Sequence, residues 1–158
     1  MYEFRPMTVE DLPLVRRWLG EPHVVQWWGK PNEQFGLISS DLHDSAMDQL
    51  VVVHETRPFG YLQCYDPSGW DGGLGLQPAG TRGIDQFIGE ADMLDCGHGS
   101  AFISSFTKRL LTAGAPRIVT DPDPANARAI RAYEKAGFRR DRMIETQSGR
   151  ALLMVRTA

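Results

Sequence analysis

Residues 120–138 read Thr120-Asp121-Pro122-Asp123-Pro124-Ala125-Asn126-Ala127-Arg128-Ala129-Ile130-Arg131-Ala132-Tyr133-Glu134-Lys135-Ala136-Gly137-Phe138, and this stretch decides the fold. It opens with a turn of Asp and Pro residues and places Asn126, a good N-cap residue, where a helix would begin. Gly137 suits the left-handed position that follows many helices. The pattern predicts a short amphipathic helix that carries Tyr133 and ends at Gly137.

The composition is that of one folded domain, residues 1–158. The chain has 158 residues, of which 42% are apolar, and its ten Pro and sixteen Gly are spread along it. This is enough chain for a proper core. No apolar run resembles a signal peptide or could cross a bilayer. The two cysteines and four histidines lack metal-ligand spacing. We therefore expect a soluble cytoplasmic protein without a metal and without a membrane partner.

The charges are unevenly distributed, although the formal net charge is only −3. Residues 66–95 hold six acids and one base, a balance of −5, whereas residues 100–142 hold nine bases and four acids, a balance of +5. Such polarity suits a protein that meets a cation on one side and a phosphate-bearing ligand on the other. A solvated surface with chance blocks of charge would explain it equally well.

The rest of the chain alternates between short strands and helices. Apolar periodicity and turn residues predict helices over residues 8–19, 31–43 and 97–113, with Thr8 and Asp11 as a capping box for the first. Residues 21–28 are expected to form a loop or a short turn, and a turn around Arg57-Pro58 is expected to join two strands. A long irregular loop, residues 66–81, carries Trp70 and Asp71. Strands are predicted at residues 2–7, 50–54, 59–65, 83–88, 117–120, 139–146 and 151–156.

The predicted last helix resembles the fourth-helix motif of the GNAT superfamily of N-acetyltransferases, in its order Asn126, then Ala129-x-x-x-Tyr133-Glu134-Lys135-x-Gly137-Phe138. The element order resembles that superfamily's α/β (α+β) fold. The resemblance implies a mixed, twisted sheet of about seven strands with four helices, whose fourth and fifth strands splay apart. Acetyl-CoA would lie in the splay, and the residues implied in binding it are Gln86, Phe87, Ile88, Asn126, Ala129 and Tyr133.

A glycine-rich segment, Asp95-Cys96-Gly97-His98-Gly99-Ser100, precedes the predicted long helix. Its glycines allow a tight turn with several N–H groups pointing inward, at the positive end of a helix dipole. The segment resembles the superfamily's pyrophosphate loop, which implies that Gly97, His98, Gly99 and Ser100 contact the cofactor. Leu94 stands where Gln or Arg is usual, and the carboxylate of Asp95 would repel a pyrophosphate. We therefore expect weakened cofactor binding.

Acetyl transfer to an amine needs a base, a partner for the oxyanion and a proton for the leaving thiolate. Asp85 is the candidate base, because an aspartate among apolar residues of a strand is costly unless it is paired or faces a wet cleft. Tyr133 is the candidate acid for the thiolate. Neither Cys64 nor Cys96 has a His-Asp arrangement that would make it a nucleophile, so direct transfer is expected.

The acceptor is implied by a narrower resemblance. The segments His23–Gly29, Gly60–Tyr65 and Arg82–Gln86, with the 121–138 stretch, resemble the bacterial aminoglycoside 6'-N-acetyltransferases, the enzymes of antibiotic resistance. The resemblance implies that Asp85 activates the 6'-amine and that Asp121 helps to hold the amines of the sugar. The other residues implied at the acceptor are Trp27, Trp28, Tyr65 and Asp66. The paired tryptophans are also explained as ordinary packing residues.

Three other functions remain open at this stage. Siderophore-synthesis enzymes that acylate the N6 position of hydroxylysine share the fold and a similar layout of Trp and Asp. Protein N-terminal acetylation belongs to the same superfamily. A binding module without turnover would fit the unusual Leu94, Asp95 and Cys96. Nucleic acid is not an expected partner, since the basic residues lack interleaved aromatics. The sequence allows a monomer or a homodimer.

Overall fold

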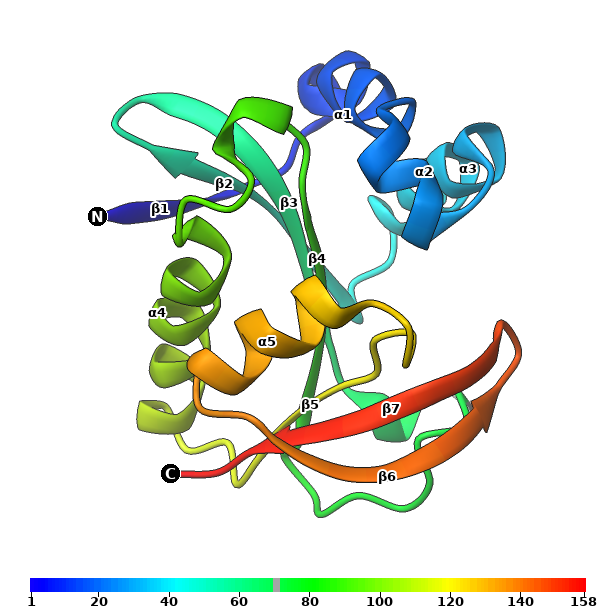
Figure 1. Cartoon of the computed structure of the whole chain (residues 1–158), viewed down its shortest axis with the longest axis vertical. Helices are drawn as coiled ribbons and strands as arrows, with labels where there is room; N and C mark the ends of the chain where they lie inside the picture. Colours follow the sequence, from blue (N-terminus) through cyan, green and yellow to red (C-terminus); the bar gives the residue numbers. More distant parts are fainter. Residues whose placement is uncertain (70–71) are drawn as a thin grey trace. The chain divides into compact units, whose positions relative to one another are not determined.

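The computed structural model describes residues 1–69 and 72–158, so Trp70 and Asp71 lie outside the described residues. Within those ranges the chain forms seven strands and five α-helices (Figure 1). The strands follow the order β1-β2-β3-β4-β5-β7-β6 in one mixed sheet. The chain comprises two compact units, residues 1–63 with 86–96, and residues 64–85 with 97–158. β3 (Arg57–Tyr65) and β4 (Arg82–Ile88) each run from one unit into the other.

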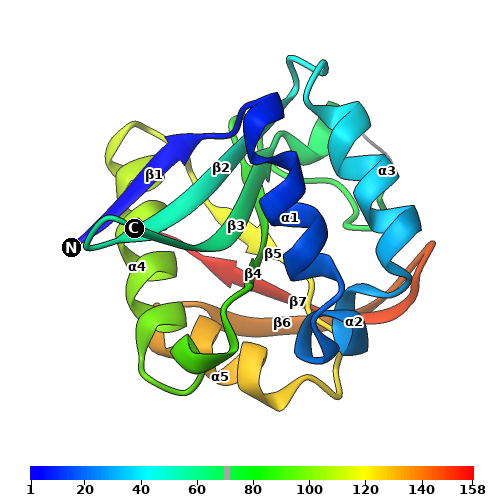
Figure 2. The same cartoon turned by 90° about the horizontal axis from the view of Figure 1, so that it is seen from above.

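The first unit begins with β1 (Tyr2–Pro6), an edge strand that pairs antiparallel with β2 (Met47–His54). Between them lie α1 (Leu12–Leu19), α2 (Pro22–Trp28) and α3 (Pro31–Asp41). α1 packs against both α2 and α3 (Figure 2). The expected capping box is present ahead of α1, where the Thr8 N–H donates to Asp11 Oδ2 at 2.9 Å. It satisfies a donor that the helix itself leaves without a partner.

Two local predictions for the first unit are wrong. Residues 22–28, expected as a loop, form α2, and the structure thus has five α-helices in its described residues where four were expected. Pro22 occupies the first helical position and Gly29, with φ of 96°, ends the helix, which is the usual asymmetry of proline and glycine.

The β2–β3 turn is formed by Glu55 and Thr56, both with positive φ, and Arg57-Pro58 already belong to β3. Such turns normally carry Asn or Gly, so Glu55 and Thr56 offer no local signal of a turn.

The core of the first unit is aromatic. Trp18 is fully buried, and its ring occupies the space that a Cβ at Gly89 would need, only 2.1 Å from that position. Tyr61 and Phe87 stack with ring centroids 5.4 Å apart, and Trp18 meets Phe87 edge-on at 6.2 Å. Such pairs add about 0.5–1.5 kcal/mol to their burial. Gly89 is therefore required at the end of β4, because no other residue would leave the Trp18 ring in place.

The second unit contains α4 (His98–Thr112), β5 (Ile118–Thr120), α5 (Ala127–Lys135), β6 (Arg139–Thr146) and β7 (Gly149–Arg156). α4 packs against α5, and α5 packs against β6 (Figure 1). β7 pairs antiparallel with both β5 and β6. β7 begins two residues before the predicted strand, because the hairpin turn lies at residues 147–148.

The predicted splay between the fourth and fifth strands is confirmed. β4 and β5 are parallel, and their paired residues are Arg82 with Ile118 and Gly83 with Val119. Beyond this point β4 runs on, while the chain after β5 stays beside β7. The Leu152 N–H donates to the Pro122 carbonyl at 2.9 Å, which continues the β5–β7 pairing past Thr120. The two parallel strands diverge because β5 follows β7.

Candidate active site

Two carboxylates lie one step beyond the point where β4 and β5 diverge. The paired residues of the two strands are 36 apart in sequence, and Asp85 and Asp121 have the same separation. Residues in register on parallel strands point to the same face of the sheet. Asp85 and Asp121 are both half-buried. Burial, and then the charge of Asp85, raise the pKa of Asp121 to about 7. The two acids therefore share a site, and the charge of one makes it harder for the other to ionise at neutral pH.

Tyr65 lies against this acid pair. Its side chain is buried, with the residue only 6% exposed, and its ring covers Gly83. A Cβ at Gly83 would lie 2.6 Å from the ring's Cε2 atom, so glycine makes the space for the phenol. Gly83 and Asp85 are two residues apart on one strand and hence on the same face. Burial raises the pKa of Tyr65, and the charges of Asp85 and Asp121 raise it further. The phenol therefore stays protonated at neutral pH beside the acid pair.

Tyr133 joins the same group of residues from α5. It is 4% exposed, and its ring meets Phe138 edge-on at 5.3 Å. Its charge would add to the raised pKa of Tyr65, which places the two phenols near each other. The helix that carries Tyr133 is capped as the sequence predicts: Asn126 accepts from the Ala129 N–H at 3.2 Å, and Gly137 has φ of 99°. Local capping thus fixes where Tyr133 enters the site.

The glycine-rich segment ends at the first turn of α4. Gly97 is the N-cap residue, with left-handed backbone at φ of 83°, and no atom lies within 4 Å of a Cβ built there. Asp95 is also left-handed, with φ of 57°. Left-handed residues alternating with right-handed ones turn successive N–H groups to one side and make an anion-binding concavity. Gly99 and Ser100 follow in the first helical turn. The Asp95 carboxylate beside this turn is exposed.

The remaining predicted site residues lie in the first unit. Trp27 and Trp28 are half-buried on α2. The Trp28 ring meets Phe87 and Tyr61 edge-on, at 5.1 and 6.2 Å. It thus combines a packing role with exposed ring surface. Gln86 and Ile88 are half-buried on β4, whereas the Phe87 side chain belongs to the core. The Ile88 carbonyl contacts His23 Nε2 at 2.8 Å.

Asp66 stands at the start of the 66–81 loop, in the second unit. It is exposed, and it accepts hydrogen bonds from the N–H and the hydroxyl of Ser68 at 2.9 and 2.7 Å. These bonds lower the pKa of Asp66. The loop is anchored at Leu74, which is buried and whose carbonyl accepts from Arg142 of β6 at 3.5 Å. Asp66 is therefore a fixed negative charge at the edge of the second unit.

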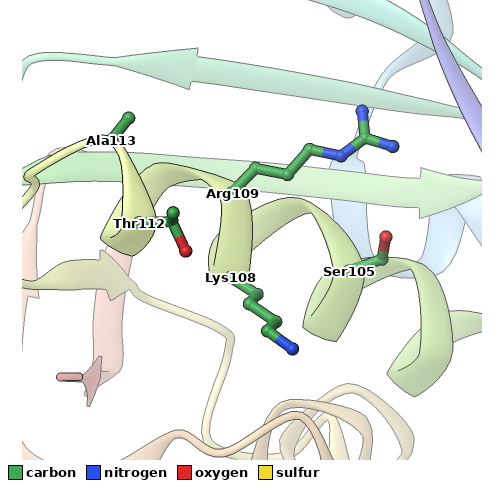
Figure 3. A pocket seen from close by; sticks show the side chains of 5 residues that line it. All are labelled: Ser105, Lys108, Arg109, Thr112 and Ala113. Carbon is green, nitrogen blue, oxygen red and sulfur yellow. The ribbon is translucent and has the colours of Figure 1, made fainter.

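A hollow of about 530 Å³ lies along the last turns of α4. Figure 3 shows its lining side chains, which come from that helix and from the residue that follows it: Ser105, Lys108, Arg109, Thr112 and Ala113. None of them was predicted as a site residue, and the acid pair lies on other elements. In residues 1–69 and 72–158 there is no cluster of three His, Cys, Asp or Glu residues that could hold a metal ion. No helix in those ranges has the length and apolarity to span a membrane.

Three residues that shape the site have no role in the sequence-based prediction. Gly83 makes room for Tyr65, Thr120 donates from its hydroxyl to the Ile84 carbonyl at 3.0 Å, and His23 contacts Ile88. A glycine inside a strand is a sign of close approach and was available from the sequence. The partners of Thr120 and His23 are 36 and 65 residues away, so only the folded chain reveals them.

Comparison with known proteins gives consistent matches. Residues 8–146 match the family model described as an acetyltransferase (GNAT) domain. The chain is 35% identical over 165 residues to "Aminoglycoside N(6')-acetyltransferase type 1" of Klebsiella pneumoniae, an alignment that covers 97% of this chain and 81% of that protein. It is 43% identical over 79 residues to a "Kanamycin resistance protein" of Rhizobium radiobacter, over 49% of this chain and 73% of that protein.

Solved structures of an aminoglycoside acetyltransferase, AAC(6')-Ib, are also similar. The complex of that protein with paromomycin and acetyl-CoA has a TM-score of 0.89 and 34% sequence identity, and the match covers 99% of this chain and 93% of that chain. Its complex with coenzyme A and kanamycin has the same score and identity, covering 99% and 95% of the two chains.

Proposed function

The chain belongs to the GNAT family of acetyltransferases, and from this premise we propose that it transfers the acetyl group of acetyl-CoA to the 6'-amine of an aminoglycoside. The observation that carries the proposal is the acid pair Asp85–Asp121, in a chain 35% identical over nearly its whole length to an aminoglycoside N(6')-acetyltransferase. Aminoglycosides carry several ammonium groups, and two adjacent carboxyl groups, of which Asp121 has a raised pKa, offer counter-charges to such cations.

The proposed acceptor residues supply charge and an aromatic wall. Asp85, Asp121 and Asp66 provide carboxylates for the ammonium groups, and the exposed ring surface of Trp27 or Trp28 provides a flat apolar surface for a sugar. Tyr65 completes this set as a donor beside the acid pair. The fixed charge of Asp66 and the raised pKa of Asp121 support these roles.

The proposed cofactor residues follow the family pattern. Gly97, His98, Gly99 and Ser100 would hold the pyrophosphate through backbone N–H groups, and the backbone of Gln86, Phe87 and Ile88 would face the pantetheine arm. Asn126 and Ala129 would contact the cofactor from the start of α5. The left-handed backbone of Gly97 supports the first of these roles. When bound, acetyl-CoA supplies an activated acyl group as a thioester.

The chemistry proposed for the chain's own residues is a direct transfer. The amine nitrogen forms a bond to the acetyl carbon, and the bond from that carbon to sulfur breaks. Asp85 accepts the proton that leaves the amine, and the charge of Asp85 acts on the neighbouring Asp121. Tyr133 donates a hydrogen bond to the departing sulfur. The pKa of about 7 lets Asp121 take up a proton beside the base at neutral pH.

The test is a thiol-release assay with purified protein, acetyl-CoA and a panel of amines. Neomycin and paromomycin form a matched pair, because they differ in carrying an amine or a hydroxyl at the 6' position. We expect turnover with neomycin and kanamycin, none at the 6' position of paromomycin, and little with hydroxylysine or a short peptide. Turnover with hydroxylysine alone would replace the proposal with the siderophore reaction, and binding of acetyl-CoA without any thiol release would leave only a binding module.

Replacing Asp85 by asparagine distinguishes a role as the catalytic base from a role in folding. Asp85→Asn should lower kcat/KM by about 10²–10⁴ while the protein stays folded, since general-base catalysis contributes about that much. Unchanged turnover in this variant would exclude Asp85 as the base.

We propose that the protein works in the cytoplasm, because acetyl-CoA is made there. Acetylation would convert one ammonium of the drug into a neutral amide, which is a mechanism of resistance.

A further inference from the structure

The residues that precede the two site acids are linked by a hydrogen bond. The Thr120 hydroxyl donates to the Ile84 carbonyl at 3.0 Å. Thr120 is 2% exposed and Ile84 is fully buried. The Thr120 hydroxyl is thus a buried hydrogen-bond partner of the Ile84 carbonyl, and a buried carbonyl that loses such a partner is costly. Thr120 immediately precedes Asp121, and Ile84 immediately precedes Asp85.

This bond lies at the step where the sheet changes its pairing. The backbone pairs of β4 and β5 are Arg82 with Ile118 and Gly83 with Val119, and the next residues in the same register are Ile84 and Thr120. At that step the contact with β4 is made by a side chain, while the backbone of Thr120 still pairs with Met154 of β7. The chain then continues along β7 as far as Pro122. The hydroxyl therefore bridges the two strands as they begin to diverge.

We propose that Thr120 is a positioning residue for the acid pair, because its hydroxyl holds β5 to β4 one step before Asp121 and Asp85 and so sets the separation of their carboxyl groups. This inference rests on the proposed function for its effect on catalysis, though not for its structural part. Without the hydroxyl, the Ile84 carbonyl would need water, and the strands would part to admit it. Asp85 and Asp121 would then stand farther apart and be better hydrated.

The titratable groups around Asp85 and Asp121 determine which pKa values a titration of this site would measure. Asp85 lies near Asp121 and raises its pKa, and the Tyr65 phenol of β3 lies near both acids. Tyr133 of α5 and Cys64 of β3 lie near Tyr65. Burial and the charges of the two acids raise the pKa of Tyr65 and keep its phenol protonated through neutral pH, so the acids are the groups that the titration follows. Wider separation and better hydration both favour the ionised carboxylate, and the pKa of Asp121 should fall toward its ordinary value.

The test compares Thr120→Val, which keeps the shape and removes the hydroxyl, with Thr120→Ser, which keeps the hydroxyl. Carbon-13 NMR of labelled aspartate carboxyl groups follows the acids directly and needs no turnover. We expect the Asp121 titration to move to lower pH in Thr120→Val and to remain at the wild-type position in Thr120→Ser. Thr120→Ala is the reserve variant if Thr120→Val does not fold.

Kinetics give the second measurement. The acidic limb of the kcat/KM profile should move with the NMR titration, and kcat/KM at pH 7 should fall about two- to tenfold in Thr120→Val, the effect of one hydrogen bond. In an Asp121→Asn background the same substitution should no longer move the limb. An unchanged Asp121 titration in Thr120→Val, or a Ser variant that behaves like the Val variant, would overturn the inference. Absence of turnover in the wild type would instead refute the proposed function and leave the NMR result valid.

Discussion

Replacing Asp121 by asparagine should stabilise the folded protein at alkaline pH. In the folded chain, Asp121 keeps its proton up to about pH 7, whereas its ordinary pKa is 3.8. Between these values the folded state binds more protons than the unfolded state, so the free energy of unfolding falls as pH rises. The contribution is fully present below about pH 4 and is lost as pH rises through about 7. Asparagine has no proton to lose and does not show this decline.

The size of this change in unfolding free energy follows from the shift in the pKa of Asp121. About three pKa units correspond to about 4 kcal/mol, at 1.36 kcal/mol for each unit. Part of this is already lost at pH 5, so the interval from pH 5 to 8.5 carries about 2–3 kcal/mol. Relative to wild type, Asp121→Asn should therefore gain about 2–3 kcal/mol of unfolding free energy across that interval. At the same time it should lose affinity for the cationic acceptor.

Urea unfolding followed by tryptophan fluorescence measures this difference at pH 5, 6, 7 and 8.5. Asp123→Asn is the matched control, since Asp123 is exposed and an amide oxygen retains its hydrogen bond from the Ala125 N–H. The control should stay within about 0.5 kcal/mol of wild type at every pH. Curves for wild type and Asp121→Asn that run parallel from pH 5 to 8.5 would refute the assignment of the raised pKa to the buried acid pair.

Three further predictions concern the same unit. Gly83→Ala should lower both stability and turnover, because its Cβ would lie 2.6 Å from the Tyr65 ring; wild-type values in both assays would contradict the close packing. Asn126→Ala should cost about 1 kcal/mol in urea unfolding through loss of the cap to the Ala129 N–H, whereas Asn126→Asp should cost less. Binding of an aminoglycoside at pH 6.5 should release a proton from the acid pair, measured by calorimetry in buffers of different ionisation enthalpy; Asp121→Asn should remove that release.

The elements predicted best are those whose signals are local. The helix after Asn126 was predicted because its cap, its periodicity and its terminal Gly137 all lie within twelve residues, and the structure reproduces each of them. α2 was missed, although Pro22 and Gly29 bound it, because only Val24 is buried in its seven residues. A helix with one buried side chain has no apolar stripe to detect.

The interaction between Asp85 and Asp121 could not be predicted from the sequence. An aspartate inside an apolar strand marks Asp85 as costly, and the resemblance to the aminoglycoside 6'-N-acetyltransferases implies a role for Asp121. Their mutual effect depends on the register of β4 with β5, which relates residues 36 apart and leaves no trace in either segment alone. The same register relates Thr120 to Ile84. Site geometry of this kind is set by strand pairing, which only the folded chain specifies.

The electrostatic free energy that makes the acid pair costly in the folded protein also favours the binding of a cation to it. Asp121 is difficult to ionise because it is buried beside Asp85, and an ammonium group placed between the two acids would remove both causes, supplying a counter-charge to each carboxylate. The folded chain is thus less stable at neutral pH than a neutral side chain would make it, and in the proposed complex the ammonium group of the acceptor would restore part of that stability. If Thr120 positions the pair as we propose, it also sets the repulsion between the carboxyl groups, because that repulsion depends on their separation. A shorter separation would strengthen cation binding but would keep the pair protonated when the amine must lose its proton. In the proposed mechanism, the Thr120 hydrogen bond therefore balances affinity for the acceptor against basicity toward it.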